Sequence, residues 1–458
     1  MVPFHTYPFC RNLWFSRFFN TLRLGSYELG PLIEGSELHM EEKHIFDTNK
    51  FRIVYFPKFK QAISLNLNQV KNENMEIIID KAVREMELVS SEEKKGTDNV
   101  WGLYLCVSNM CNASCVYCFA NKGDYGKEKG LMSFDVAVKA IDFFMEKVPD
   151  DKEAAFIFFG GEPLMAFDVI EKSCEYINDT YAHRNKSFHI TTNGTLLDEE
   201  KIDFMIRNKF RVAISIDGGD EIQNKQRPLR NGENSFEAVT KNISYLLQRS
   251  KAVARGTYFN FDYDLCKCYN DLLSIGFQEV NIVPDILDVD SDEKMNQLLH
   301  QLNRFHDYVV SYAREKKEFP FGLLIMQIRK LFYPKMQMVY DCGLGSIIYC
   351  VDYKGDIYPC HRHSGDYKYT LGNVKNGDCK VFINKAFSYQ CEKCWNRYTC
   401  SHGCRYEDIK TGGNEKNKYS CAYSKKMTEI AIALCSELDK EMLYKIMRCT
   451  DKIIGGNR

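Results

Sequence analysis

The chain has 458 residues, a length typical of two or three domains, and 45% of them are hydrophobic, the ordinary proportion for a globular protein. The net charge of −1 argues against a nucleic-acid partner, and no apolar run approaches the roughly 20 residues that a membrane-spanning helix needs. The N-terminal residues lack the features of a secretory signal, so we expect a cytoplasmic protein, in which 19 cysteines indicate metal binding or redox chemistry rather than disulfides.

The first 95 residues predict only small elements. Residues 1–40 show no clear periodicity, and Met40 is a second candidate for the start of the protein, which would make the preceding residues an extension. The segment 41–95 is expected to form a hairpin, a helix and a polar linker. The hairpin strands are FRIVYF (51–56) and QAISLN (61–66), the helix is 75–88, and the linker is 90–99.

Strand-like and helical segments alternate between residues 96 and 285. This alternation predicts parallel strands joined by helical crossovers, a fold in which ligands bind at the carboxyl ends of the strands. The expected strands are 101–107, 154–161, 188–194, 211–219, 253–259 and 279–284. The expected helices are 133–147, with Ser133 as its N-cap, 167–181, 198–208, 235–249 and 266–275.

The last third of the chain changes in composition. Residues 286–340 predict a helical connector, and residues 341–425 are rich in cysteine, glycine and tyrosine with only short strand-like pieces. That segment has too few aliphatic residues for an ordinary core, so we expect metal to organise it. Residues 426–458 predict a closing helix.

Three cysteines follow the first strand of the alternating region with the spacing CxxxCxxC, at Cys111, Cys115 and Cys118. Three thiolates in a short loop can hold three irons of a [4Fe–4S] cluster and leave the fourth iron free to bind a small molecule. The alternative is a structural zinc loop, although such a site uses four protein ligands.

The segment CNASCVYCFA (111–120) resembles the cysteine motif of the radical S-adenosylmethionine (SAM) superfamily, and Gly160-Gly161-Glu162-Pro163 resembles its GGEP segment. The resemblance covers roughly residues 100–285. It implies that the free iron chelates SAM and that an electron from the cluster cleaves SAM to a 5′-deoxyadenosyl radical. It also implies that SAM is contacted by Tyr117 or Phe119, by the GGEP segment, by Thr192 and Asn193, by Ser215 and Asp217, and by Arg255, which would pair with the SAM carboxylate.

Seven of the nine cysteines in 342–421 resemble the SPASM domain, a C-terminal extension that holds auxiliary [4Fe–4S] clusters in some radical SAM enzymes. The resemblance implies one closed cluster on Cys391, Cys394, Cys400 and Cys421, and a second on Cys342, Cys360 and Cys404. The second set has three thiolates, so its cluster would keep an open iron unless Cys350 or Cys379 fills the position. A pair of structural zinc sites is the alternative. The other cysteines, such as Cys106, Cys174 and Cys435, lack cluster spacing and are expected to be small buried side chains.

These resemblances imply an α/β fold, a partial (β/α)6 TIM-type barrel with a small cysteine-rich iron–sulfur domain at its C-terminus. They imply SAM and three [4Fe–4S] clusters as cofactors, an electron donor such as flavodoxin or ferredoxin, and a peptide or protein substrate. We expect an oxidoreductase that modifies or crosslinks a ribosomally made peptide, and residues 41–95 are a candidate for recognising it, unless they only extend the scaffold.

Three alternative functions are weighed against this expectation. In sulfatase-maturing relatives an aspartate typically follows the cysteine that matches Cys360 and acts as the base, whereas His361 follows it here. His361 and Asp366 are therefore the candidate catalytic residues, and formylglycine formation is the first alternative. The second is a radical SAM enzyme that acts on a small molecule, and the third is a non-catalytic zinc or iron–sulfur protein.

Overall fold

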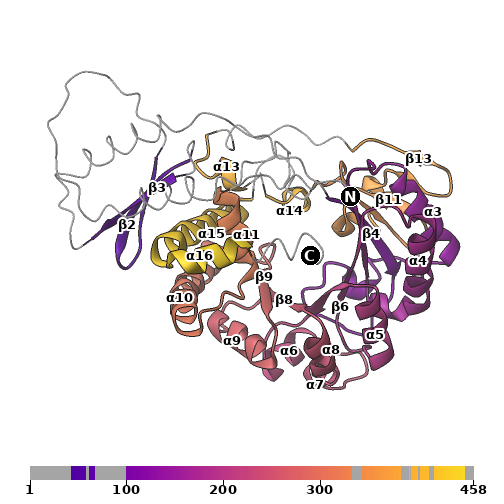
Figure 1. Ribbon diagram of the computed structural model, residues 1–458, viewed down its shortest axis with the longest axis horizontal. Coiled ribbons are helices and arrows are strands. Elements are labelled where there is room, and N and C mark those ends of the chain that lie inside the picture. The colour runs from indigo at the N-terminus through magenta and orange to yellow at the C-terminus, as the bar shows by residue number, and fades with distance from the viewer. Residues whose placement is uncertain are drawn as a thin grey trace, which may run out of the picture.

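The computed structural model describes residues 43–57, 61–67, 100–332, 343–382, 391, 393–400, 403–411 and 417–448. Its centre is a curved sheet with helices on its outer side (Figure 1). Six parallel strands form one continuous part of this sheet, in chain order. They are β4 (Val100–Ser108), β5 (Glu153–Gly160), β6 (Lys186–Thr192), β7 (Arg211–Ser215), β8 (Ala252–Tyr258) and β9 (Glu279–Pro284).

Helices connect these strands, which confirms the predicted α/β partial barrel. Ser133 caps the first helix as predicted, by accepting a hydrogen bond from the amide of Val136. The helices are α3 (Phe134–Met145), α4 (Phe167–Thr180), α5 (Glu199–Arg207), α6 (Asp220–Gln226), α7 (Ser235–Thr240), α8 (Ile243–Arg249) and α9 (Leu265–Ile275). The predicted connector contains α10 (Asp292–Lys316) and α11 (Gly322–Phe332).

The single helix predicted at 235–249 is wrong, because the structure has α7 and α8 there. Asn242 separates them, and its side-chain amide donates to the carbonyl of Leu197 at 2.5 Å. This bond to a distant loop competes with continuation of the helix. Helix α6 was also not predicted from the sequence.

The two faces of the sheet have different surroundings, because successive side chains of a strand point to opposite sides. Leu103, Leu105 and Val107 of β4 are buried in the main core under the helices. Tyr104 and Cys106 belong instead to a separate cluster on the inner face. Residues of the inner face therefore surround the space inside the curved sheet.

Strands from the cysteine-rich region continue the barrel sheet. Strand β10 (Ile348–Val351) pairs in parallel with β4. The strands β11 (Asp356–Tyr358), β12 (Gly372–Asn373) and β13 (Asp378–Cys379) follow in antiparallel order. This region also contains α13 (Arg397–Cys400), α14 (Arg405–Lys410) and the short helices η4 (His361–His363) and η5 (Tyr367–Tyr369). The cysteine-rich segment is thus fixed to the barrel by main-chain hydrogen bonds.

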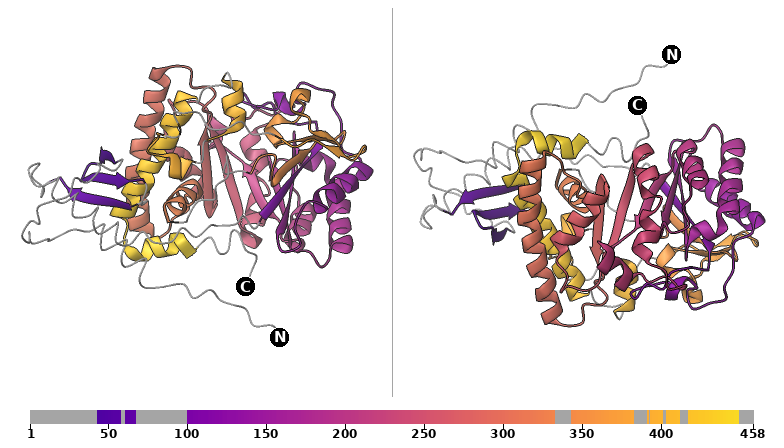
Figure 2. Two further views of the ribbon diagram at one scale, coloured as in Figure 1. Left: turned by 90° about the horizontal axis from the view of Figure 1, so that it is seen from above. Right: turned by 90° about the horizontal axis from the view of Figure 1, so that it is seen from below.

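The N-terminal hairpin is part of a three-stranded antiparallel sheet of β1 (His44–Asp47), β2 (Phe51–Phe56) and β3 (Gln61–Asn66). It lies beside the closing helices and away from the barrel strands (Figure 2). Ser64 contacts Ser436 of α15 (Lys418–Glu437) at 2.6 Å between their hydroxyl oxygens. The ring of His44 stacks on Trp395 at 3.7 Å between centroids. Strand β1 was not predicted from the sequence, and the helix predicted at 75–88, the linker and residues 1–40 lie outside the described residues.

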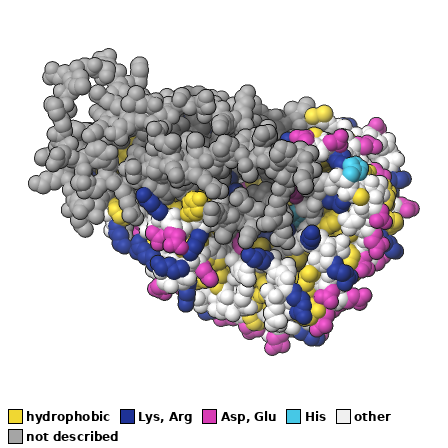
Figure 3. Space-filling model, viewed as in Figure 1, with side chains coloured by type: hydrophobic (Ala, Val, Ile, Leu, Met, Phe, Trp, Pro, Cys, Tyr) yellow, Lys and Arg dark blue, Asp and Glu magenta, His cyan; other side chains and the backbone are white. Residues whose placement is uncertain are grey.

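The predicted closing helix is two helices, α15 and α16 (Lys440–Arg448). In the part of the chain that the structure describes, no helix has both the length and the hydrophobicity to cross a bilayer. On the described part of the face shown in Figure 3, acidic and basic side chains are interspersed.

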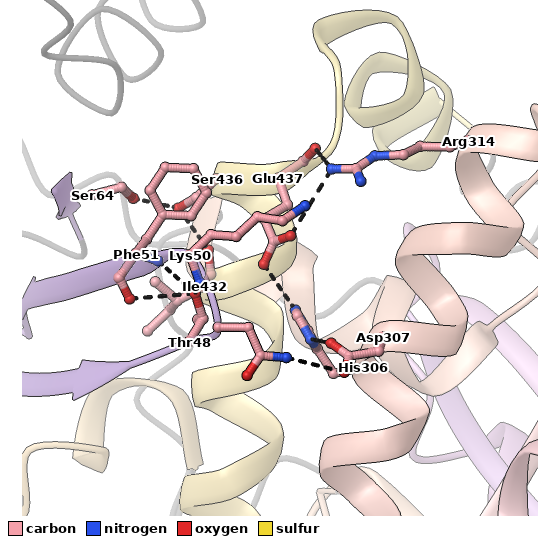
Figure 4. Close-up of polar contacts among 11 residues, drawn as sticks. Thr48, Lys50, Phe51, Ser64, His306, Asp307, Arg314, Ile432, Ser436 and Glu437 are labelled. Carbon is pink, nitrogen blue, oxygen red and sulfur yellow. Dashed lines mark hydrogen bonds and ion pairs between the residues drawn. The ribbon is translucent and has the colours of Figure 1, made fainter. Parts of the chain in front are cut away.

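Glu437 at the end of α15 joins the N-terminal sheet, α10 and α15 (Figure 4). Its carboxylate, only 6% exposed, lies 3.3 Å from the His306 ring nitrogen and 3.9 Å from Arg314. Burial alone would raise its pKa, but the hydrogen bond from His306 and the charges of His306, Lys50 and Arg314 together lower it.

Replacing Glu437 with glutamine is expected to reduce the free energy of unfolding by about 1–3 kcal/mol, because it removes a charged hydrogen-bond acceptor from a largely buried site. Because the folded pKa is lowered, the stabilisation is fully present above the pKa of the unfolded chain. It is lost as the pH falls through the folded pKa. Urea unfolding of the anaerobically prepared protein measures the effect. The control is Glu441→Gln, which breaks an exposed pair with Lys445 and is expected to change stability by about 0.5 kcal/mol or less. Equal losses in the two variants would contradict this account.

Candidate active site

The loop after β4 carries Cys111, Cys115 and Cys118 at the carboxyl edge of the sheet. The three thiols lie close enough for Cys115 and Cys118 to raise the pKa of Cys111. Burial is the main cause of that rise, to about 12, and the charge of Glu162 is the second. Because thiolates are the metal-binding form, loading the loop with metal must release protons from these thiols.

The GGEP segment packs directly against this loop. The amide of Gly161 donates to the carbonyl of Ser108 at 2.7 Å, and that of Glu162 donates to Met110 at 2.8 Å. A Cβ atom on Gly161 would lie 2.3 Å from the Met110 carbonyl oxygen, and one on Gly123 would lie 2.4 Å from the Cβ of Cys111. Glycine is therefore required at both positions for the cysteine loop to approach the strand ends.

Glu162 is buried, with 1% of its surface exposed, and its carboxylate connects the ends of β5 and β6. It accepts hydrogen bonds from the Leu164 amide at 3.0 Å, the Thr192 hydroxyl at 2.6 Å and the Asn193 amide at 2.7 Å. Burial raises its pKa to about 7 although these hydrogen bonds lower it. Glu162 therefore fixes Thr192 and Asn193 beside the loop. Its predicted contact with SAM stays a prediction.

Asn193 extends from the end of β6 to the cysteine loop. Its side-chain amide lies 3.9 Å from the Cys111 sulfur and donates to the side-chain oxygen of Asn112 at 2.8 Å. Asn112 in turn donates to the hydroxyl of Thr195 at 2.8 Å. N–H groups directed at a cysteine sulfur are among the features that tune iron–sulfur clusters.

A segment that the sequence analysis did not single out holds the other side of the loop. Residues 226–230, called the clasp below, run antiparallel to residues 112–116. Three main-chain hydrogen bonds join them: Ser114 to Pro228 at 2.8 Å, Val116 to Gln226 at 3.0 Å and Arg230 to Asn112 at 2.9 Å. No local sequence pattern identifies the clasp, because its partner lies more than 100 positions earlier in the chain.

Arg227 of the clasp forms a buried ion pair with Asp217, 3.0 Å between Nε and Oδ1, with side chains 12% and 0% exposed. Its guanidinium also lies 3.9 Å from the sulfur of Cys115 and 5.3 Å from the ring centroid of Tyr117. The Tyr117 hydroxyl donates to Asp217, which also accepts from the amide of Thr257 at 2.8 Å. Burial by itself would lower the pKa of Arg227, but Asp217, Tyr117 and Cys115 raise it. Arg227 is thus a fixed positive charge beside Cys115, a predicted cluster ligand.

The inner face of the sheet brings several predicted residues together. Ser215 and Arg255 are neighbours across β7 and β8. The ring of His361 stacks on Tyr104 at 4.4 Å and lies 4.7 Å from the ring of Phe159 and 6.0 Å from that of Phe119. The pKa of His361 is lowered to about 3, mainly by burial and also by the charges of Arg255 and Arg362, so its imidazole is neutral near pH 7. Asp366 is exposed and caps η5, and none of its described contacts is with His361.

The predicted auxiliary cysteines gather in two places. Cys391, Cys394 and Cys400 all raise the pKa of Cys421, whose main increase comes from burial and which lies on α15. Cys360 and Cys404 both lie close enough to Tyr406 to contribute to its raised pKa, of which burial is the main cause. Cys342 lies outside the described residues. The sulfur of Cys350 lies 3.4 Å from that of Cys106 on the inner face, and Cys379 is on β13, two strands away from β11.

The donor sets fit iron–sulfur clusters chemically, because thiols from one short loop face one another and N–H groups of Asn193 and Arg227 approach their sulfurs. Among the described residues, no three His, Cys, Asp or Glu side chains converge as ligands of one metal ion. A cluster with one thiol for each iron requires wider spacing than a single tetrahedral ion, whose Zn–S bonds are about 2.3 Å.

Comparisons with known proteins agree with this site. The family model of the radical SAM superfamily matches residues 105–260. An uncharacterised protein, MJ0907, of Methanocaldococcus jannaschii is 29% identical over 64% of this chain and 95% of its own length. A cysteine-type anaerobic sulfatase-maturating enzyme of Clostridium perfringens is 25% identical over 71% of this chain and 94% of its own length.

A solved structure described as native anSMEcpe with bound AdoMet and Cp18Cys peptide shares the fold. It matches with a TM-score of 0.62 and 22% identity over 76% of this chain and 99% of that chain. The region that the family model matches, residues 105–260, contains the cysteine loop, the GGEP segment and the clasp. Residues 105–260 are therefore a radical SAM domain, and the chain is an enzyme.

Proposed function

We propose that this enzyme binds SAM at a [4Fe–4S] cluster held by Cys111, Cys115 and Cys118, cleaves it reductively to a 5′-deoxyadenosyl radical, and oxidatively modifies or crosslinks a peptide. The observation that supports this most is the cysteine loop at the sheet edge, held between the GGEP segment and the clasp. When bound, the cluster supplies the electron that breaks the carbon–sulfur bond of SAM.

The residues around the loop have separate roles in this proposal. Arg255 has no ion pair among the described residues, which suits it to bind the SAM carboxylate beside Ser215. Thr192, Asn193 and Asp217 hold the strand ends in register with the loop. Tyr117 and Phe119 flank the last cysteine and offer aromatic faces to the adenine.

Two auxiliary clusters belong to the proposal, one on Cys391, Cys394, Cys400 and Cys421 and one on Cys342, Cys360 and Cys404. The second set leaves an iron open, because the sulfur of Cys350 faces Cys106 and Cys379 is two strands away. We further propose a cytoplasmic location and an electron donor such as flavodoxin or ferredoxin.

A peptide substrate is supported by the sulfatase-maturating relative, whose name describes action on a protein. The substrate side chain would contact His361, Tyr104 and Phe159 on the inner face of the sheet. These residues present a neutral imidazole and two aromatic rings to it. The three-stranded sheet of β1, β2 and β3 is the candidate recognition element, since a strand edge can bind an extended peptide.

Formylglycine formation is the second candidate function, and the name of the same sulfatase-maturating relative favours it.

The two candidate functions give different products when the cluster-loaded enzyme is incubated anaerobically with SAM, dithionite and a cysteine-containing peptide. A crosslink removes two hydrogens, retains the sulfur and consumes the free thiol, whereas formylglycine loses the sulfur and gains an aldehyde that reacts with a hydrazine. We expect the crosslink and one 5′-deoxyadenosine per product. Formation of 5′-deoxyadenosine with no change in any peptide tested would contradict the peptide proposal. Modification of a small metabolite would instead support an enzyme that acts on small molecules.

A further inference from the structure

A cavity of about 330 Å³ borders the cysteine loop, and Cys111 forms part of its wall. Lys122 and Lys129 come from the same loop, and Arg230 comes from the end of the clasp. We call these three residues the basic rim. All three are exposed, and each contributes a positive charge within one cavity.

The charge of the basic rim is not neutralised by neighbouring carboxylates in the part of the chain that the structure describes. Asp124 is the one acidic residue that lines the cavity, and its Oδ1 already accepts hydrogen bonds from Asn121 and from the amide of Gly126, both at 2.8 Å. Glu128 pairs instead with Lys354 at 3.0 Å. Arg230 donates to the main-chain carbonyl of Lys122 at 2.8 Å, so its charge has no carboxylate partner there. Three cations therefore face solvent against one carboxylate.

This grouping differs from the interspersed charges on the described part of the face in Figure 3. The side chains of Lys122 and Lys129 form no hydrogen bond within the described residues, and the loop is fixed instead by Asn109, Asp124, Arg230 and main-chain groups. A concentration of one sign of charge beside a concave surface attracts partners of the opposite sign and increases their rate of association.

The position of Cys111 indicates what such a partner would do. Cys111, a proposed cluster ligand, is part of the wall of a cavity that opens to solvent, whereas the side chains of Asp217 and Arg227 are buried. A carrier protein is too large to enter the barrel, but it can approach Cys111 at this cavity. Electron-transfer complexes typically have small interfaces and depend on charge steering.

We propose that the basic rim is the docking surface for an acidic one-electron carrier protein with a flavin or an iron–sulfur cluster. This inference rests on the proposed function and locates one of its partners. In the step, one electron leaves the reduced carrier and is taken up by the cluster at Cys111, so the carrier is oxidised and the cluster is reduced by one electron. No bond forms and no proton has to move.

The test is the double charge reversal Lys122→Glu with Lys129→Glu, which leaves Arg230 and its hydrogen bond in place. Reduction of the cluster-loaded enzyme by a reduced flavodoxin of strongly negative net charge is followed by stopped-flow as the visible absorption of the cluster is lost. We expect the rate in the variant to fall about tenfold or more at low salt. Raising the ionic strength is expected to slow the wild type and to narrow the difference.

The matched control reverses the charges of Lys209 and Lys251, exposed lysines that lie one or two residues before β7 and β8 and therefore at the opposite edge of the sheet. It is expected to be reduced at the wild-type rate. With dithionite in place of flavodoxin, the wild type and both variants are expected to form 5′-deoxyadenosine equally.

The other possible outcomes would contradict either the docking surface or the proposed function. Unchanged reduction of the Lys122/Lys129 variant by flavodoxin, or an equal loss in the control, would overturn the docking surface. A loss of dithionite-driven SAM cleavage in the variant would also overturn it, by placing these lysines in cofactor binding. If the wild type fails to cleave SAM with dithionite, the proposed function itself fails.

Discussion

Replacing Cys111, Cys115 and Cys118 together with alanine is expected to abolish reductive cleavage of SAM and to remove about four iron atoms per chain. Alanine cannot ligate iron, and no other thiol of the described loop can substitute, since Asn193 and Arg227 are the groups that otherwise approach these sulfurs. The measurements are iron and sulfide content after anaerobic reconstitution and the yield of 5′-deoxyadenosine with dithionite.

The control for this variant is Cys266→Ala. Cys266 lies on α9, partly buried, and is outside all the proposed ligand sets. It is expected to retain the iron content and SAM cleavage of the wild type. The auxiliary sets are expected to keep their iron in the triple variant, because their thiols come from residues 342–421. Undiminished SAM cleavage in the triple variant would refute the proposed cluster site.

Arg227→Met is expected to destabilise the protein by about 3–5 kcal/mol and to reduce cluster occupancy at Cys115. The substitution leaves the carboxylate of Asp217, whose side chain is 0% exposed, without its cation, and breaking a buried ion pair from one side has this cost. It also removes the positive charge 3.9 Å from the Cys115 sulfur. Denaturant unfolding and iron analysis measure the two effects.

Three comparisons separate this effect from an ordinary loss of charge. Lys225→Met, two residues earlier, breaks an exposed pair with Glu221 and is expected to change stability by about 0.5 kcal/mol or less. The loss of stability in Arg227→Lys is expected to lie between those of Lys225→Met and Arg227→Met, because one ammonium group cannot reproduce the planar contacts of the guanidinium. Asp217→Asn added to Arg227→Met is expected to recover part of the loss, since no unpaired charge then remains buried. Additive losses in the double variant would show that the two residues are not coupled.

Local patterns predicted much of the fold and the cysteine loop of the candidate site. The run of β-branched and aromatic residues in each segment of 96–285 predicted the six parallel strands, because side-chain periodicity directly reflects which face is buried. The spacing of Cys111, Cys115 and Cys118 predicted the cluster loop for a similar reason, since ligands on one short loop are close together whatever the rest of the chain does.

The sequence by itself therefore determined the class of fold, the cysteine loop and the superfamily. Only the tertiary structure placed Arg227 against Cys115, β10 beside β4, and Cys350 against Cys106. These contacts join residues 112 to 246 positions apart, so they depend on how whole strands and loops pair and not on any neighbouring residues. Main-chain hydrogen bonds and buried charges stabilise these long-range contacts, and neither interaction produces a periodic pattern of residues in the sequence.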